Sequence, residues 1–455
     1  MKGTFLKTYV VLGVLAILGA YMYFVESKSP EEGEKKKQKV FSFAKAKVKE
    51  FSLTPRSGDL IRLAKDGSSW KMTAPMAVDA DSSSADSLLG SLEDLESDET
   101  ISESPQSLQD YGLDPPQNTV AFLLTGASEP LKLLVGSKTP DGSSVYAKLP
   151  TNARVFTIPS YEATTFDKKP FDFRDRSLLH VKRDDVRSVE ITGPDGSYSL
   201  AKADKGEWAF TKPLVTRAGR WGIDGLLGTL ENLRMDSVAA EDAKDPKELK
   251  ALGLLPAARS ITVAFADGTT KKLEIGAATK DKKYNARDAS KTLVAVIPPT
   301  LVDDLAKGMK DLREKRVLDV PAYDVGAFDV EPLGQAKRIY VRSTSKDKDG
   351  IEVSKWKRTS PDTKDLDTNK VQDALFKVGS AEAQEFLDQP KGLDAYGLDK
   401  PVLRVEIRYA GAKPPTWFEI GKKDGSAYAR RPDDVAILKL DPAKTEELLK
   451  AFTDL

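Results

Sequence analysis

A short pattern that occurs three times constrains the fold of this chain more than any other feature. It consists of a proline, a leucine three positions later, a tyrosine or leucine three positions after that, and then glycine and leucine, over residues 105–113, 246–254 and 390–398. Proline suits the first turn of a helix, and glycine closes a helix in the left-handed conformation. We therefore expect each copy to form a short helix that begins at its proline. The glycines that close the three copies are Gly112, Gly253 and Gly397.

A second element precedes each copy. It has the form Trp-x-x-Thr-x-Pro and begins at Trp70, Trp208 and Trp356. Between this element and the glycine pattern, apolar residues recur at helical spacing, most clearly over residues 85–95 and 223–233. That spacing predicts an amphipathic helix with one buried face. The chain is thus expected to contain three tandem copies of one module.

Each module is expected to be an α+β unit with a mostly antiparallel sheet. Apolar and β-branched segments surround each tryptophan and follow each glycine pattern, as strands do. The later segments end at a second glycine, which is Gly136, Gly276 or Gly421. Similar sequences at residues 173–179 and 312–318 mark the two joins, and we expect such an element to hold one module against the next. The modules are therefore placed at residues 40–181, 182–320 and 321–455.

The N-terminal sequence favours a single membrane anchor. Residues 8–25 carry no charged side chain, and as a helix they would reach about 27 Å, close to the hydrocarbon thickness of a bilayer. No Ala-x-Ala-like site follows, which favours an uncleaved helix over a signal peptide. Residues 1–7 then form a cytoplasmic tail, and residues 26–39, rich in lysine and glutamate, form a flexible stalk. The bulk of the chain is expected in the periplasm, although the stalk lysines are typical of a cytoplasmic flank.

Composition limits the possible chemistry. The chain of 455 residues has 70 basic and 70 acidic side chains, so it has no net positive charge to attract nucleic acid. It has no cysteine, which excludes disulfides, thiolate metal sites and a cysteine nucleophile. A single histidine excludes metal sites built on several histidines. We expect no cofactor and no metal, and no phosphate loop or nucleophile elbow is present.

One histidine and one acidic cluster are the candidates for a catalytic or metal-binding site. His180 lies at the first join without the sequence context of a catalytic triad, so a structural or surface role is favoured. Asp79, Asp81, Ser83 and Asp86 resemble part of a calcium loop, but its central glycine and final glutamate are missing. This cluster is expected to cap the helix over residues 85–95.

Aromatic and basic residues that recur in the modules are possible ligand or partner contacts. They follow the second glycine of each module, and their recurrence favours a role in the core over a role in ligand binding. These residues are Tyr146, Lys148, Tyr284, Arg287, Tyr428 and Arg430.

The apolar N-terminus, the charged stalk, the Trp-x-x-Thr-x-Pro element, the Tyr-Gly-Leu turn and the Phe-Arg-Asp-Arg-Ser-Leu-Leu segment together resemble a bacterial family known as domain of unknown function 4340. The resemblance extends over nearly the whole chain from Val40. The second module departs from the family pattern at Leu252, which stands where the Tyr-Gly-Leu turn has its tyrosine. The third module lacks the joining segment. The resemblance implies an envelope protein held to the inner membrane, often associated with ABC-type exporters similar to those of gliding motility. It implies no catalytic residue.

The sequence favours a non-enzymatic, membrane-anchored scaffold or accessory subunit of an ABC-type transporter or envelope complex. Its expected partners are membrane lipid, through the N-terminal helix, and a membrane permease with its ATPase. An alternative is an envelope module that binds glycan or peptide through the recurrent aromatic and basic residues. A third hypothesis is a hydrolase of unknown type.

Overall fold

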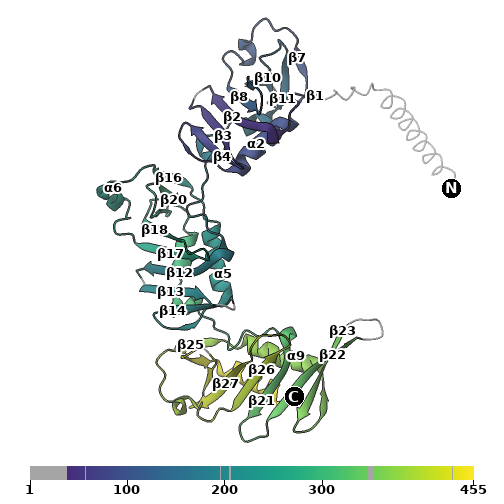
Figure 1. The fold of residues 1–455 in the computed structure, drawn as a ribbon, viewed down its shortest axis with the longest axis vertical. Coiled ribbons are helices and arrows are strands. Elements are labelled where there is room, and N and C mark those ends of the chain that lie inside the picture. The colour runs from purple at the N-terminus through teal and green to yellow at the C-terminus, as the bar shows by residue number, and fades with distance from the viewer. Residues whose placement is uncertain (1–37, 57, 195, 204–205, 347–351, 433) are drawn as a thin grey trace, which may run out of the picture. The chain divides into compact units, whose positions relative to one another are not determined.

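The chain folds into three nine-stranded sheets, one after another, with helices packed against each (Figure 1). The first sheet belongs to a compact unit that ends at Arg176, and the other two form a unit over Ser177–Leu455. All recorded strand pairs within the sheets are antiparallel, for example β2 with β8. The expected α+β class with three tandem antiparallel sheets is therefore confirmed. This computed structural model describes residues 38–56, 58–194, 196–203, 206–346, 352–432 and 434–455.

The first sheet has the strand order β5-β4-β3-β2-β8-β9-β10-β11-β7, so two meanders meet at the central pair β2 and β8. The first meander consists of β2 (Val48–Pro55), β3 (Ile61–Asp66), β4 (Ser69–Ala74) and β5 (Val78–Asp79). The second consists of β8 (Asn118–Leu124), β9 (Leu131–Lys138), β10 (Ser144–Lys148) and β11 (Val155–Pro159), with β7 (Thr100–Ser102) at the far edge. Helix α2 (Ser82–Asp94) follows the first meander, and α3 (Ser160–Phe166) and α4 (Pro170–Phe173) follow the second.

The second and third sheets repeat this order. The second contains β12 (Val186–Gly193), β13 (Gly196–Lys202), β14 (Trp208–Lys212), β15 (Thr216–Arg217), β16 (Ser237–Ala240), β17 (Arg259–Phe265), β18 (Thr270–Ala278), β19 (Tyr284–Asp288) and β20 (Val294–Ile297), with helices α5 (Arg220–Glu231), α7 (Thr300–Leu305) and α8 (Met309–Leu312). The third contains β21 (Val325–Pro332), β22 (Arg338–Lys346), β23 (Glu352–Ser360), β24 (Lys364–Leu366), β25 (Ala383–Leu387), β26 (Leu403–Tyr409), β27 (Thr416–Lys423), β28 (Ser426–Arg430) and β29 (Ile437–Leu440), with α9 (Thr368–Ser380) and α10 (Pro442–Thr453). The helix expected over residues 299–312 is divided into α7 and α8.

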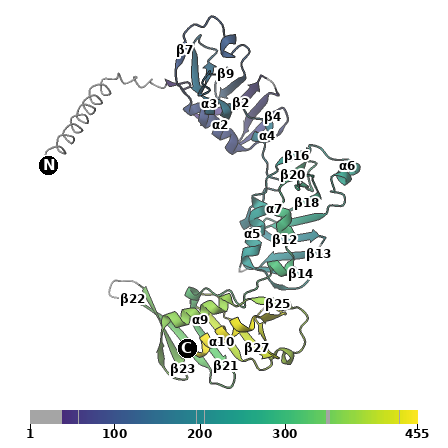
Figure 2. The ribbon, with the colours of Figure 1, turned by 180° about the vertical axis from the view of Figure 1, so that it is seen from behind.

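Each core lies between one face of a sheet and the helices that follow its two meanders. In the third repeat, α9 and α10 pack side by side on the same face, as Figure 2 shows. Alternate strand residues point to that face, so β2 and β12 bury every second or third side chain and expose those between. Trp70 and Trp356 are buried in these cores, in ring contact with Phe51 and Phe328. The recurrent tryptophans are thus core residues.

Asp81 begins α2 as expected. Its carboxylate accepts hydrogen bonds from the backbone N–H groups of Ser83 and Ser84, which caps the helix. The nearby Asp86 accepts a hydrogen bond from the indole nitrogen of Trp70, at 3.0 Å. The predicted cap is therefore confirmed for Asp81, whereas Asp86 bonds the tryptophan and Asp79 lies in β5.

The glycine pattern forms a helix beginning at its proline only in the second repeat. There, α6 (Pro246–Ala251) has Asp245 as its N-cap, and the carboxylate accepts from the N–H of Lys247. In the first and third repeats the prediction is wrong, because the helical part is a 3-10 turn over Gln109–Tyr111 or Leu393–Tyr396 that excludes the proline. The three glycines nevertheless share φ angles of +66°, +73° and +65°. The left-handed ending of the turn is therefore common to all repeats.

Two glycines of each repeat meet where this turn packs onto the sheet. A Cβ atom on Gly397 would lie 2.3 Å from the carbonyl oxygen of Lys422, and one on Gly421 would lie 2.4 Å from that of Tyr396. Gly112 and Gly136 are equally confined, by Ser137 and by the carbonyl of Tyr111. A side chain at any of these positions would separate the turn from the strand. Close backbone approach therefore explains why both glycines recur.

The predicted anchor, residues 8–25, and most of the predicted stalk lie outside the described residues. Within the part of the chain that the structure describes, no helix is long and apolar enough to cross a membrane. The stalk prediction is wrong at its last two residues, because Gln38 and Lys39 form β1 (Gln38–Lys39) and pair with β6 (Glu96–Ser97).

Candidate functional site at the junction of the second and third repeats

The segment that joins the second and third repeats is hydrogen-bonded to both of them. The N–H of Gly219 donates to the carbonyl of Leu312, and the N–H of Glu314 donates to that of Arg217 in β15. On the other side, the N–H of Val317 donates to Ala381, and the N–H of Ala383 donates to Lys315. The segment over residues 312–318 thus holds one repeat against the next, as the sequence predicts.

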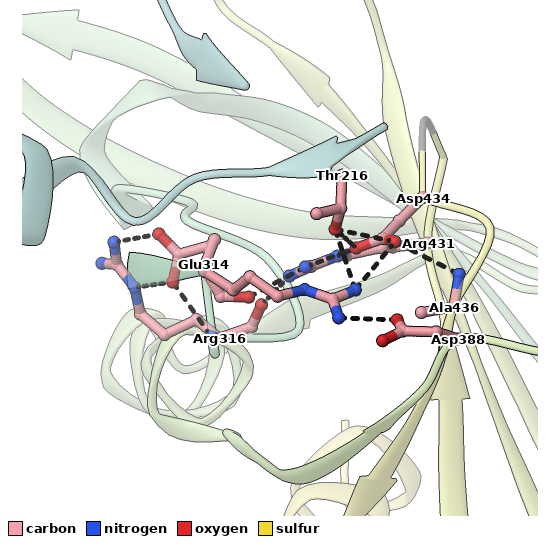
Figure 3. Close-up of polar contacts among 8 residues, drawn as sticks. Thr216, Glu314, Arg316, Asp388, Arg431, Asp434 and Ala436 are labelled. Atoms are coloured by element: carbon pink, nitrogen blue, oxygen red, sulfur yellow. Dashed lines mark hydrogen bonds and ion pairs between the residues drawn. The ribbon is translucent and has the colours of Figure 1, made fainter. Parts of the chain in front are cut away.

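Asp434 lies at the centre of the buried ion network that crosses this junction (Figure 3). Its side chain has no exposed surface. The carboxylate accepts a hydrogen bond from the hydroxyl of Thr216 at 3.0 Å and another from the backbone N–H of Ala436 at 3.2 Å. It also forms ion pairs with Arg431 at 2.7 Å and with Arg313 at 3.6 Å. One carboxylate of the third repeat therefore binds groups from both repeats and from the joining segment.

Arg431 is as deeply buried as its carboxylate partner. Besides Asp434, its guanidinium donates to the backbone carbonyls of Glu314, at 2.8 Å, and of Arg316. Burial lowers the pKa of Arg431, and the charge of Asp434 opposes that shift. The third repeat thus holds the carbonyl groups of the joining segment through a charged donor.

Arg313 completes the network from the joining segment. Its guanidinium donates to the hydroxyl of Thr216 at 2.9 Å and to the carboxylate of Asp388 at 2.6 Å. The same group lies over the ring of Phe386, 3.8 Å from the ring centroid. Its Nε atom is buried without a hydrogen-bond partner among the described residues. Arg313 thereby connects β15 of the second repeat to the segment after β25 of the third.

The arrangement is suited to holding two repeats together. Arg313 and Arg431 pair with the fully buried Asp434, and Arg313 also pairs with the part-buried Asp388. A buried ion network of this type contributes little net stability compared with an apolar contact, but removal of one partner is costly. A different register of the two repeats would leave these buried charges without their partners.

The recurrent tyrosines pack against the glycine turn. The rings of Tyr111 and Tyr146 are 5.0 Å apart in the first repeat, and those of Tyr396 and Tyr428 are 5.1 Å apart in the third. Each pair links the turn to the strand that follows the polar loop.

Tyr284 is not the counterpart of these tyrosines. The strand register places Ala286 opposite Ile275, as Ala429 lies opposite Ile420, so Asn285 corresponds to Tyr428. Tyr284 lies three residues before Arg287, whereas Tyr428 lies two residues before Arg430. Asn285 donates to the carbonyl of Leu252, which itself replaces the turn tyrosine. The second repeat therefore replaces both members of the aromatic pair.

The recurrent basic residues are paired within their own repeats. Arg287 contacts Glu274 at 2.8 Å, and Arg430 contacts the buried Glu419 at 2.5 Å. In the first repeat, the ammonium group of Lys148 donates to the carbonyls of Leu149 and Asn152. Each basic residue therefore donates to an acceptor within its own repeat.

His180 is exposed, and its backbone has a left-handed φ of 47°. Its carbonyl accepts a hydrogen bond from the ammonium group of Lys271. Among the described residues, no group of three or more histidine or acidic side chains is arranged to hold a metal ion.

Sequence reasoning did not find the ion network. Arg431 and Asp434 lack counterparts in the other repeats, where Leu149 and Asn152, or Asp288 and Lys291, occupy these positions. A comparison of repeats therefore could not select them. Arg313 was detectable, because Arg174 stands at the same place in the first joining segment and makes the same backbone bridge to its own repeat.

Together, the sheets and the junction define a tandem-repeat α+β protein whose repeats are joined by hydrogen-bonded segments. The chain belongs to the family described as domain of unknown function (DUF4340), whose model matches residues 70–220, 208–401 and 356–455. Each match begins at the tryptophan that marks a repeat. No curated protein sequence matches the chain.

Solved structures give only weak similarity. A DNA polymerase III subunit beta from Pseudomonas aeruginosa shares 9% identity, with 87% of this chain and 93% of that chain covered and a TM-score of 0.13. A DnaN sliding clamp from Bartonella birtlesii LL-WM9 shares 7% identity, with 89% and 92% covered and a TM-score of 0.14. These scores are too low to support an argument about fold or function.

Proposed function

We propose that the protein is a membrane-anchored extracytoplasmic scaffold or accessory subunit of a membrane complex of the ABC-transporter type. The observation that carries this proposal is the fixed junction between two repeats, in which Arg313, Arg431 and Asp434 are buried together. A protein that holds partners in a defined arrangement needs repeats whose register is specified. Buried charges provide such specification at a cost in stability that a simple spacer would not require.

The internal pairing of the basic residues also supports a scaffold over the alternative of a glycan- or peptide-binding module. Arg287 and Arg430 would have to release Glu274 and Glu419 to bind a ligand carboxylate. Lys148 would have to leave two backbone carbonyls. Each exchange costs charge-assisted hydrogen bonds within the fold.

The cellular location follows from the same proposal. Residues 8–25 anchor the chain in the inner membrane, and residues from Val40 onward lie in the periplasm. A C-terminal reporter that is active only outside the cytoplasm should therefore be active. A fusion to a reporter that works only in the cytoplasm is the matched control, and activity of that fusion instead would reverse the proposed topology.

The proposed partners are tested by purification from native membranes in gentle detergent. The tagged full-length chain should recover a permease and its ATPase, identified by mass spectrometry. A tagged single-pass membrane protein of similar abundance should recover neither. Recovery of envelope glycan or peptide without a permease would favour the binding-module alternative and contradict the scaffold.

A further inference from the structure

Four core-facing positions at one end of the sheet are apolar in the first repeat, and three of them carry charged residues in the third. They lie on the strands corresponding to β3, β4 and β5. In the first repeat they are Ile61, Leu63, Met72 and Val78; in the second, Tyr198, Leu200, Phe210 and Thr216; and in the third, Arg338, Tyr340, Arg358 and Lys364.

The strand register establishes this correspondence. Leu63 lies opposite Met72, Leu200 opposite Phe210, and Tyr340 opposite Arg358. On the next strand, Val78 lies opposite Met72, Thr216 opposite Phe210, and Lys364 opposite Arg358. The third repeat therefore has charged groups where the first has a continuous apolar core. We call Arg338, Arg358 and Lys364 the cationic corner.

The cationic corner lines an open polar pocket of about 390 Å³. The turn at Pro361 and Asp362 forms one wall, and Thr453 and Asp454 at the end of α10 form another. The Nε atom of Arg358 and the hydroxyl of Tyr340, which lies opposite it on β22, are buried without a hydrogen-bond partner among the described residues. Such groups are costly in a core, by about 1 to 3 kcal/mol each. A polar site at this place therefore needs a reason other than packing.

The charges of the corner are only partly balanced. Arg358 pairs with the exposed Asp362 at 2.7 Å. Arg338 donates to two neutral acceptors, the carbonyl of Thr453 and the amide oxygen of Gln335. Lys364 lies directly opposite Arg358 on the neighbouring strand, and the charge of Asp362 acts on both cations. Arg338 therefore remains a cation that makes no ion pair among the described residues.

The corresponding corner of the second repeat already binds a carboxylate. There, Thr216 stands at the position of Lys364, and its hydroxyl donates to Asp434 of the third repeat. Arg313, which follows Leu312, stands at the position of Thr453, which follows Phe452. Leu312 is the last residue of α8, and Phe452 is the last but one of α10. The second repeat thus shows which chemical group this corner of the fold accepts.

We propose that the cationic corner of the third repeat is a docking site for a carboxylate-bearing segment of a partner protein. This proposal rests on the scaffold role proposed above. It adds the surface to which a partner binds and the chemistry by which that surface recognises the partner. Lys364 replaces the neutral hydroxyl of Thr216, and Arg338 and Arg358 replace Tyr198 and Phe210, so this corner is more cationic than that of the second repeat and favours a carboxylate.

A second copy of this chain does not fit the site in the way that the third repeat fits the second. The loop that carries Asp434 has the same length in all repeats, but Asn152 and Lys291 stand at this position in the first and second. Asp434 itself is buried in the network of its own chain. The carboxylates must therefore come from a different protein.

The test measures binding of a fluorescently labelled, glutamate-rich peptide to the detergent-solubilised full chain, by fluorescence anisotropy at roughly 50 mM salt, where surface charges are weakly screened. The variant carries Arg338→Tyr, Arg358→Phe and Lys364→Thr, which are the residues of the second repeat. These side chains already occur at these positions of the same fold, so the variant is expected to fold. Its affinity should fall by about tenfold or more.

Lys355→Thr is the matched control, because this lysine lies on the same strand pair but on the opposite face from Arg358, and it should leave affinity unchanged. A glutamine-rich peptide of equal length should not bind. Equal affinity of the triple variant and the unchanged chain, with unchanged folding by circular dichroism, would overturn the proposal. Competition by inorganic phosphate as effective as that of the peptide would also overturn it, in favour of a site for free oxyanions.

Discussion

The hydroxyl of Thr216 in the second repeat donates a hydrogen bond to the carboxylate of Asp434 in the third, at 3.0 Å. The two residues are separated by 218 positions in the sequence. This contact joins the second and third repeats directly, because it involves no residue of the joining segment. It shows that the third repeat contacts the second directly as well as through the covalent connection.

Asp434→Ala should destabilise the unit formed by the second and third repeats. The substitution leaves Arg431 buried with no carboxylate at its guanidinium and removes one counter-ion of Arg313. The free energy of unfolding should fall by about 3 to 5 kcal/mol, as for other buried pairs that lose one partner. Urea denaturation followed by tryptophan fluorescence measures the change.

Asp365→Ala is the matched control for this prediction. Asp365 forms an ion pair of 3.9 Å with Lys357 on the surface of the third repeat, and its side chain is 92% exposed. Exposed pairs of this kind contribute little, so the variant should differ from the unchanged chain by less than about 1 kcal/mol. Equal effects of the two substitutions would show that the junction network does not hold the repeats together.

His180→Gly should leave the cellular phenotype of the protein unchanged. The residue has a left-handed φ of 47°, which glycine adopts without cost, and the recorded contact to Lys271 uses its carbonyl. His180→Val should instead lower the free energy of unfolding by about 1 to 3 kcal/mol, because a β-branched residue is strained there. Thermal denaturation and complementation of a deletion strain measure the two effects. Loss of the phenotype in a stable glycine variant would revive the hydrolase hypothesis.

Tyr198 should make the stability of the second repeat fall at alkaline pH. Burial raises the pKa of Tyr198 to about 12, against the opposing charge of Arg259, and the neutral hydroxyl donates to the carbonyl of Lys307 at 3.0 Å. The unfolded tyrosine ionises near 10. Its stabilising contribution is therefore fully present below about pH 10 and is lost as the pH rises toward 12.

Urea denaturation of the unchanged chain and of Tyr198→Phe at pH 9 and pH 11.5 tests this sign. The unchanged chain should be the more stable at pH 9, by about 1 kcal/mol for one buried hydrogen bond. The difference should shrink or reverse at pH 11.5. A difference that is the same at both pH values would mean that Tyr198 ionises alike in the folded and unfolded states.

The sequence predicted the periodic parts of the fold because repeated local patterns specify them. Helix α2 follows from apolar residues at helical spacing and from Asp81 as its cap, and the three-sheet arrangement follows from the repeated strands. Register was harder to predict. Tyr284 was paired with Tyr428 by position in the loop, but Ala286 and Ala429 occupy equivalent places in their ladders, so the counterpart of Tyr428 is Asn285. A single inserted position changes the face to which a side chain points.

The junction and the cationic corner were beyond sequence reasoning for a different reason. Both depend on residues that differ between the repeats, whereas the repeats were recognised in the sequence by the residues that they share. Arg358 occupies the position of Met72 and Phe210, which becomes evident only when the strand pairs are aligned. Asp434 acquires its role from Thr216, which is remote in the sequence.

Gly397→Ala should loosen the third repeat more than Gly425→Ala does. Both glycines have left-handed backbones, with φ of +65° and +75°, so alanine costs about 1 to 2 kcal/mol at either position. At Gly425 the new methyl group meets nothing within 4 Å, but at Gly397 it would lie 2.3 Å from the carbonyl oxygen of Lys422. The turn at Gly397 must therefore also move away from β27. Urea denaturation should show a clearly larger loss for Gly397→Ala, and limited proteolysis should cut the third repeat while the unit that ends at Arg176 stays protected. Equal losses for the two variants would mean that only the left-handed backbone, and not the close packing of the turn on the strand, requires glycine there.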